Sequence, residues 1–382
     1  MKRTIMLIAL LLLAAGTAGC WNLREPNELA FILGAGIDLT KDGRFEISSQ
    51  IAIPAGIQGG SDGGGGSDKK SFYVASATGK NIMDAGQNMQ IKLSRTLFYA
   101  HRQTILIGQR MAERGISNYL DMFVRNPKSE MRSLILVVKG GQAKDALEIE
   151  PIFDPYISMT FSRVQQSVGY KPYYYRQFLA DALSEGNDPL VPAVALMPSR
   201  RYVNSGSAIL KKNDNLKLKG FLNEMETFQA YWMKGRQKSF IFTSFVPQGK
   251  GEVSLKMESL TRQIRIRPGK PMRVAVRLRG SGTVVENNSS LNPSKAPDLK
   301  LIDRHFGQAV ETSVRELIDK AQKRYKTDFL GFGEYVHRQH PLQWKTMKRN
   351  WDRTFPELQV SVQVELNVKD PGQTNSNLTN TP

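Results

Sequence analysis

The only cysteine of the chain, Cys20, is the residue whose position most clearly predicts chemistry. A basic pair at residues 2–3 is followed by an apolar run over 5–15 and by small residues at 16–19. This order is typical of a bacterial lipoprotein signal, in which cleavage falls directly before a cysteine that receives lipid. We therefore expect residues 1–19 to be a signal peptide and Cys20 to be the lipid attachment site.

A diacylglycerol thioether on Cys20 would leave a mature chain whose first residue carries two fatty chains. Each buried methylene contributes about 0.8 kcal/mol, and two chains are what stable membrane anchoring usually takes. The apolar run is roughly half of the ~20 residues that a transmembrane helix needs, so we expect removal of the segment. We expect no cofactor beyond this diacylglycerol, with or without an N-acyl chain such as palmitate. A free cysteine after an ordinary leader is the alternative.

The sequence gives little support for catalysis. It contains no His-Glu-x-x-His motif, and its Gly-x-Ser-x-Gly match at 59–63 lies in a glycine-rich segment that no helix directly follows, unlike a nucleophile elbow. His337 and His340 could share a helical face as metal ligands, but only Glu334 accompanies them, and a packing role is the alternative. We therefore predict that the protein is not an enzyme. We assign no catalytic and no metal-binding residue, and the ligand-binding residues stay unknown.

The segment Asp328–Glu334 and the two tryptophans after it form the most unusual C-terminal pattern. Two glycines stand between large apolar residues, which suits a turn that reverses the chain after a helix. Trp344 and Trp351 lie seven residues apart on a short helix expected after Pro341, with basic residues around them. Such a helix could lie at a membrane interface. The alternative is that both tryptophans pack in the core.

Arginines alternate with apolar residues in a predicted β-hairpin over 264–279. They are Arg265, Arg267, Arg273, Arg277 and Arg279. Because alternate residues of a strand share one face, these guanidinium groups should form a ladder on one side of the sheet. The ladder could bind an acidic partner or anionic headgroups, or it could only be solvated.

The charge of the chain narrows the choice of partners. Its formal charge is +18, and loss of the basic residues 2 and 3 with the signal peptide lowers this to +16. Outside a bacterial membrane, a basic body is attracted to the anionic membrane surface over ~8–10 Å at physiological salt. We expect no nucleic acid partner, because an exported and lipid-tethered protein rarely meets nucleic acid.

The N-terminal half reads as strands alternating with helices. Strands over 28–38 and 45–53, and further strands and helices up to residue 140, predict an N-terminal mixed-sheet domain over 20–140. Within it, the glycine-rich segment 59–68 has no apolar side chain to bury, so we expect a surface loop.

A helical middle domain and linker are expected over 141–200. Three helices are predicted up to residue 183, and the prolines at 189, 192 and 198 indicate a linker. The tyrosines at 170 and 173–175 could face a ligand, or they could pack in a core or interface.

A C-terminal α+β domain is predicted over 205–370, with a disordered tail at 371–382. Apolar residues recur on one face of a long helix over 302–325, and a strict alternation over 358–369 indicates a strand with one wet face. This helix should pack on the sheet. The fold class is therefore α+β, a multi-domain mixed α/β protein with largely antiparallel sheets.

Several landmarks together resemble the Ger(x)C lipoproteins, the C subunits of bacterial spore germinant receptors. The resemblance spans nearly the whole chain and rests on residues 19–25, 29–38, 206–222, 328–333, 341–345 and 350–355. It implies a subunit tethered to the outer face of the spore inner membrane, beside two integral-membrane subunits. One of these has a large soluble domain and the other is transporter-like.

The resemblance also implies a role in nutrient sensing. Germinant receptors trigger germination after sporulation, and their C subunit is not known as an enzyme. The function implied is that of a lipid-anchored subunit required for receptor assembly and signalling. The alternative is a stand-alone solute-binding lipoprotein that serves a membrane transporter.

Overall fold

The computed structural model describes residues 4–5, 25–53, 70–119, 130–198 and 201–370. Cys20 and nearly all of the predicted signal peptide lie outside these ranges, as do the glycine-rich segment 59–68 and the tail 371–382. The predictions made for those three segments therefore stay predictions.

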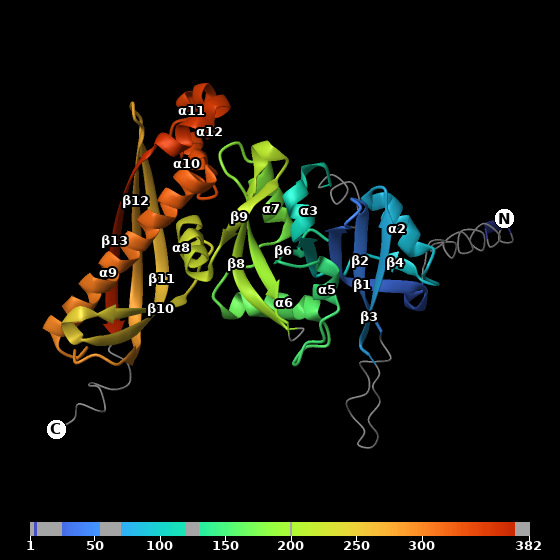
Figure 1. Ribbon diagram of the computed structural model, residues 1–382, viewed down its shortest axis with the longest axis horizontal. Coiled ribbons are helices and arrows are strands. Elements are labelled where there is room, and N and C mark those ends of the chain that lie inside the picture. Colours follow the sequence, from blue (N-terminus) through green and yellow to red (C-terminus); the bar gives the residue numbers. More distant parts are fainter. Residues whose placement is uncertain (1–3, 6–24, 54–69, 120–129, 199–200, 371–382) are drawn as a thin grey trace, which may run out of the picture.

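A nine-stranded mixed sheet occupies residues 29–222 (Figure 1). Its strands are β1 (Leu29–Leu39), β2 (Phe45–Ala52), β3 (Phe72–Gly79), β4 (Thr96–Phe98), β5 (Thr104–Gly108), β6 (Leu134–Lys139), β7 (Leu190–Leu196), β8 (Tyr202–Lys211) and β9 (Lys217–Leu222). They lie in the order β3-β2-β1-β5-β6-β7-β8-β9, with β4 beside β1. Strands β1, β5, β6 and β7 pair with one another in parallel at the centre of the sheet. Antiparallel pairs extend the sheet at both edges, through β2 and β3 on one side and β8 and β9 on the other.

Helices cover both faces of this first sheet. One face carries α2 (Ile82–Gln90), α3 (Gln109–Arg114) and α7 (Tyr175–Leu183), and the other carries α5 (Ala143–Leu147) and α6 (Ile157–Ser167). In β6, Val137 packs with the first group and Leu136 with the second. Because parallel strands between two helical layers have no wet face, β6 reads as an unbroken apolar run.

The segment predicted as a linker contains a core strand instead. Leu190, Val191 and Ala193 of β7 are fully buried, and β7 pairs with both β6 and β8. Pro192 stands beside an irregularity in the pairing with β8, where a residue without an N–H group is tolerated. The sheet therefore runs through the boundaries predicted near 140 and 200. The hairpin β8–β9, predicted to open the C-terminal domain, completes the first sheet.

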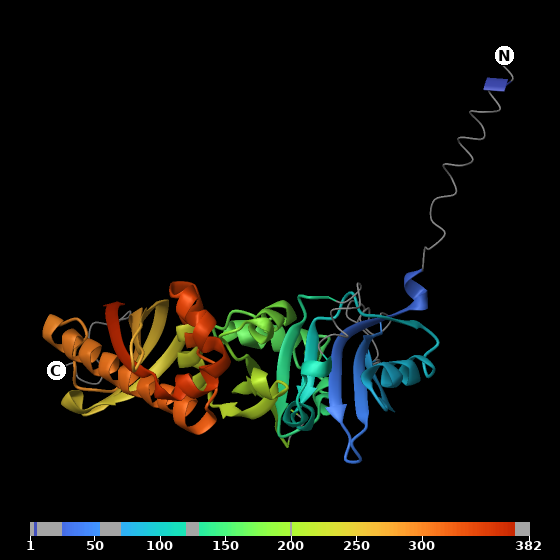
Figure 2. The same ribbon diagram turned by 90° about the horizontal axis from the view of Figure 1, so that it is seen from above.

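A second sheet of four strands occupies the other end of the elongated molecule (Figure 2). Its strands, in spatial order, are β10 (Phe240–Val246), β11 (Gly251–Arg267), β12 (Arg273–Asn287) and β13 (Gln359–Asp370). The long helix α9 (Ala296–Asp319) packs across one face and continues into a π-helical turn at Lys320–Tyr325. The predicted apolar face is confirmed, because Ile302, Phe306 and Val314 are buried against the sheet.

Helix α8 (Glu224–Lys234) lies between the two sheets (Figure 1). The Tyr231 hydroxyl is 2.8 Å from the Ser207 hydroxyl of β8, while the Trp232 indole donates to the Thr261 carbonyl oxygen of β11 at 2.9 Å. Three short helices follow α9 along the chain: α10 (Phe332–Gln339), α11 (Pro341–Met347) and α12 (Trp351–Thr354). Their apolar side chains pack in the same core as α8 and the second sheet. The predicted fold class is confirmed as a mixed α/β fold whose strand pairings are more often antiparallel than parallel.

Candidate functional site

The two halves of the molecule meet in a polar cluster, which we call the junction and which is largely buried except at the exposed Glu185. It consists of Asp181, Glu185, Gly186, Asn187, Asp188, Lys234, Asp328, Gly333, Trp344 and Trp351. The first five residues belong to the end of α7 and the loop before β7, and the others to α8 and the segment after α9.

Asp328 is the centre of the junction. Its carboxylate accepts hydrogen bonds from the backbone N–H groups of Gly331, Phe332 and Gly333 at 2.8–3.0 Å, and from the Trp351 indole at 3.0 Å. These bonds satisfy the free N–H groups at the start of α10, and Gly331, at φ 79°, makes the turn that aims them. Burial raises the pKa of Asp328 to about 6 even though these hydrogen bonds favour the ionised form.

Reciprocal hydrogen bonds join Asp328 to Asp188 across the junction. The Asp328 N–H donates to the Asp188 carboxylate, and the Asp188 N–H donates to the Asp328 carbonyl oxygen, both at 3.0 Å. The Asp188 carboxylate also accepts from the Lys212 N–H at 2.8 Å, and burial raises the pKa of Asp188. The Asp188 carboxylate thus links the turn that follows β8 to the segment that follows α9.

Two glycines allow this close approach. The Glu334 N–H donates to the Gly186 carbonyl oxygen at 2.8 Å, and a Cβ at Gly186 would overlap the backbone of Gly333. A Cβ at Gly333 would in turn lie 2.8 Å from the Trp351 indole nitrogen. The glycine between Phe332 and Glu334 is therefore required by close packing, whereas Gly331 is required by its positive φ.

Lys234, at the end of α8, supplies the positive charge of the junction. Its ammonium donates to the Asn187 side-chain oxygen at 2.7 Å and lies 4.0 Å from the Asp181 carboxylate. Burial lowers the pKa of Lys234, and the charge of Asp181 opposes that shift. Asp181 also accepts from the Tyr173 hydroxyl at 2.7 Å.

Both tryptophans predicted as an apolar stripe are core residues. Trp344 and Trp351 are 1% and 6% exposed, and their ring centroids are 5.2 Å apart. The Trp344 indole donates to Glu185 at 3.0 Å, and Lys348 donates to the same carboxylate at 2.7 Å. The core interpretation is therefore confirmed, and the membrane-interface interpretation of this stripe is wrong.

The junction is built to hold two parts of the chain in one arrangement. The Asp188 carboxylate and the Lys234 ammonium are bonded to backbone and side-chain groups of the other half, so removing one partner would leave another polar group buried and unsatisfied. Sequence reasoning found Asp328 and Trp351 but missed Glu185, Asp188 and Lys234. The turn-forming run Gly186-Asn187-Asp188 was the only local signal for them.

The two histidines weighed as metal ligands have different neighbours. The His337 ring stacks on Trp344 with centroids 5.9 Å apart, and the His340 Nε2 atom is 3.2 Å from the Ile266 carbonyl oxygen. Within the described ranges, no group of three or more potential metal ligands comes together. Packing roles therefore account for both rings.

The predicted arginine ladder lies on the face of the second sheet opposite α9. Arg265, Arg267 and Arg273 are exposed there, and Glu365 of β13 forms ion pairs with Arg277 and Arg279, the latter at 2.7 Å. These two arginines lower the pKa of Glu365, with Arg279 contributing most. The ladder is thus partly neutralised at one end, while at the other end no described carboxylate forms an ion pair with Arg265, Arg267 or Arg273.

The tyrosine cluster lies mostly in the core. Tyr170, Tyr173 and Tyr175 are at most 1% exposed and Tyr174 is half-buried, so the interpretation as core or interface residues is confirmed for the first three. Across the part of the chain that the structure describes, no helix has the length and apolar character needed to cross a bilayer.

Comparisons with known proteins identify the class of protein to which this fold belongs. Residues 22–196 match the family described as spore germination protein N-terminal domain, and residues 205–372 match the family described as spore germination B3/GerAC like, C-terminal. The chain therefore belongs to the Ger(x)C family of spore germination proteins.

Relatives and one solved structure resemble the chain over nearly its whole length. It is 26% identical to spore germination protein KC of Bacillus subtilis (strain 168), covering 98% of this chain and 97% of that protein. It is also 26% identical to spore germination protein B3 of the same organism, covering 96% of each chain. The crystal structure of the GerBC protein shares the fold, with a TM-score of 0.58 at 20% identity, covering 91% of this chain and 99% of that one.

Proposed function

We propose that this chain is the lipid-anchored, non-catalytic C subunit of a nutrient germinant receptor, required for receptor assembly and for signalling of spore germination. The observation that carries the proposal is the family match over both halves, 22–196 and 205–372. The names of the relatives, spore germination proteins KC and B3, support the same process.

In this proposal Cys20 carries the diacylglycerol, and the protein lies on the outer face of the spore inner membrane. The first described elements, from Pro26 into β1, lie at one end of the molecule, and the sheet packed by α9 lies at the other (Figure 2). A lipid at residue 20 would therefore hold the first sheet near the bilayer. The second sheet and its arginine ladder would extend toward partners or along the anionic surface.

The partners proposed are two integral-membrane subunits, one with a large soluble domain and one transporter-like. The junction supports a scaffolding role, because its hydrogen bonds fix the relative position of the two sheets that such partners would contact. A subunit that holds other chains in register needs this kind of internal rigidity.

The anchor is tested by replacing Cys20 with Ala in the full-length chain, with Asn22→Ala as the neighbouring control. Mass spectrometry of the wild-type N-terminal peptide should show cleavage before Cys20 and the added mass of the lipid. The Cys20→Ala chain should keep its signal peptide, assemble poorly with its partners and slow nutrient germination. An unmodified Cys20 in a wild-type protein found free in solution would sink the proposal.

The partners are tested by recovering the tagged full-length chain from membranes of sporulating cells. Recovery of two multi-spanning proteins, one of them transporter-like, supports a receptor complex. Recovery of only an ATP-driven permease would instead favour a stand-alone solute-binding lipoprotein. The Asn22→Ala chain should behave as the wild type in the same experiment.

A further inference from the structure

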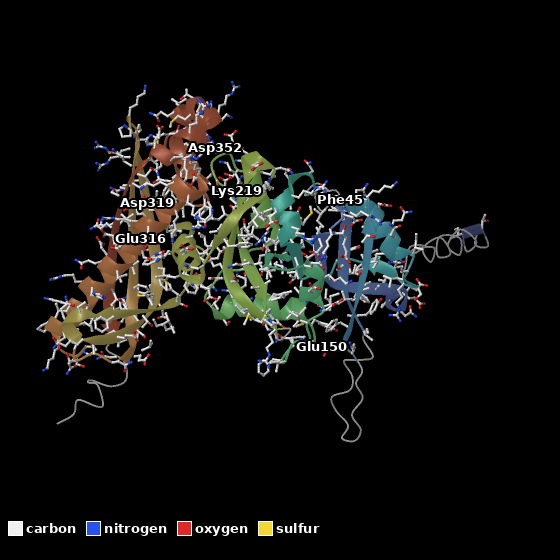
Figure 3. The ribbon with its side chains drawn as sticks, viewed as in Figure 1. Phe45, Glu150, Lys219, Glu316, Asp319 and Asp352 are labelled. Atoms are coloured by element: carbon white, nitrogen blue, oxygen red, sulfur yellow. The ribbon has the colours of Figure 1, made fainter. Side chains whose placement is uncertain are left out.

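A basic pocket lies beside the junction, where the hairpin β8–β9 faces the end of the π-helical turn after α9. Its volume is about 480 Å³, within the range of small-molecule sites. The lining residues are Lys211, Asp214, Lys219, Arg324, Tyr325 and Lys326. Figure 3 labels Lys219 and, on the same side of the molecule, Asp352.

The cations of this pocket exceed its carboxylates. Lys219 is paired with Asp214, and the Lys211 ammonium donates to the Lys326 carbonyl oxygen at 2.8 Å and lies 3.7 Å from Asp352. Among the described residues, no carboxylate lies within ion-pair distance of Arg324 or Lys326. The Lys219 hydrogen bond and the charges of nearby lysines lower the pKa of Asp214, as expected in a positive field.

The walls of the pocket are fixed by close packing between the two halves. The Tyr325 hydroxyl donates to the Phe221 carbonyl oxygen at 3.2 Å, and a Cβ at Gly220 would lie 2.7 Å from the Tyr325 ring. The Arg324 guanidinium lies 5.2 Å from the centroid of the same ring. The Tyr325 ring therefore forms one rigid side of the pocket, and positively charged side chains surround it.

We propose that this pocket binds a small free anion that carries two negative charges, such as a phosphate dianion. A guanidinium and an ammonium without carboxylate partners provide charge-assisted hydrogen bonds, and the guanidinium fork matches a phosphate or carboxylate group. A bound anion would contact both the β8–β9 hairpin and the turn after α9. It would thus stabilise the arrangement of the two sheets, whether or not the chain is anchored by lipid.

Calorimetric titration of the full-length chain in non-ionic detergent tests the site, with inorganic phosphate at pH 8 as the probe. The pocket variant is Arg324→Gln with Lys326→Gln, and the control is Lys300→Gln with Arg304→Gln, two exposed cations early in α9. Both variants lose two positive charges. We expect one saturable phosphate site in the wild type and in the control, and at least tenfold weaker binding in the pocket variant.

Two further measurements make the test specific. Nitrate at equal ionic strength should bind at least tenfold more weakly than phosphate, and phosphate should raise the melting temperature of the wild type but not of the pocket variant. Equal affinities of the pocket and control variants, or the absence of saturable binding, would overturn the proposal. So would a pocket variant whose only defect is weaker flotation with phosphatidylglycerol vesicles, because the site would then bind lipid headgroups.

Discussion

The two sheets of this protein bury their strands in different ways. In the first sheet, helices cover both faces, and the neighbouring residues Leu136 and Val137 are both fully buried. In the second sheet, α9 covers one face only, so Val362 is 5% exposed while the next residue, Gln363, faces solvent. The number of covered faces thus decides whether a strand reads as an apolar run or as an alternation.

The free edge of the second sheet also depends on α9. Side chains of this helix bond to the backbone of β13: Asp303 accepts from the Val368 N–H at 2.8 Å, and Arg315 donates to the Val362 carbonyl oxygen at 3.3 Å. Burial raises the pKa of Asp303. In the second sheet, a single helix therefore covers one face and part of one edge. In the first sheet, several helices cover the faces, and additional antiparallel strands protect the edges.

The largest expected effect breaks the joint between the two sheets. Replacing Trp351 with Ala should lower the free energy of unfolding by about 3–5 kcal/mol, because it removes a buried ring and one donor to Asp328. Urea denaturation followed by circular dichroism measures the loss. Trp351→Phe should lose less, and the exposed control Arg353→Ala should change little. A Trp351→Ala protein as stable as the control would contradict a packed junction.

The next effect compares neighbouring positions in one strand of each sheet. Leu136→Ala should cost about 2–5 kcal/mol, and Val137→Ala about 1.5–3 kcal/mol, because each faces a helical layer. In β13, Val362→Ala should be costly while Gln363→Ala stays within roughly 0.5 kcal/mol. The same denaturation measurement applies. If Val137→Ala were as mild as Gln363→Ala, the first sheet would not be covered on both faces.

A smaller effect depends on pH. The native pKa of Asp328 is about 6, against 3.8 for an unperturbed aspartate, so the native state holds a proton that the unfolded state has lost between these values. Stability should therefore fall as pH rises from 4 to 6, by roughly 2–3 kcal/mol from this group.

Asp328→Asn should remove that part of the slope, and the exposed control Asp319→Asn should not. Burial also raises the pKa of Asp38 in the first sheet to about 6. The Asp328→Asn variant should therefore still lose some stability between pH 4 and pH 6, because Asp38 is unchanged. Unfolding midpoints measured from pH 4 to pH 7 test this. An Asp328→Asn slope equal to that of the wild type would contradict the raised pKa.

The smallest effect concerns the open face of the second sheet. Glu365→Gln removes the carboxylate that pairs with Arg277 and Arg279, and it should leave the unfolding midpoint nearly unchanged. Binding to vesicles with anionic lipid should rise roughly fivefold, the effect of one added positive charge near the surface. Glu316→Gln, on exposed α9, is the control with the same charge change. Equal vesicle binding of the two variants would argue against contact between the ladder and the membrane.

Periodicity in the sequence predicts the elements that bury only one face. The helix over 302–325 and the alternating strand from 358 are predicted in this way. The strand β7 was missed because Pro189, Pro192 and Pro198 indicated a linker. Only its neighbours explain it, since pairing with β6 and β8 buries its apolar residues and a local irregularity accommodates Pro192.

The candidate site also has one part that the sequence predicts and one part that only the structure shows. Asp328, Gly331, Gly333 and Trp351 were visible as an unusual local pattern, but their meaning depended on a partner segment. The carboxylate of Asp188, 140 residues away in sequence, bonds to the Asp328 N–H, and no spacing rule connects the two. The basic pocket is likewise formed by a hairpin and a helix end that are more than 100 residues apart.

The sequence by itself determined the local choices of this protein: which segments are helical, which strands have a wet face, and where glycine must turn the chain. Those choices depend on residues a few positions apart, whose side chains a single element places on one face. The tertiary structure decided that β8 and β9 join the first sheet, that both tryptophans are buried, and that Lys234 and two aspartates meet in one junction. The physical reason is that a polar group removed from water needs a hydrogen-bond partner. The folded chain supplies that partner from whichever segment lies nearby, and this segment can be far away in the sequence.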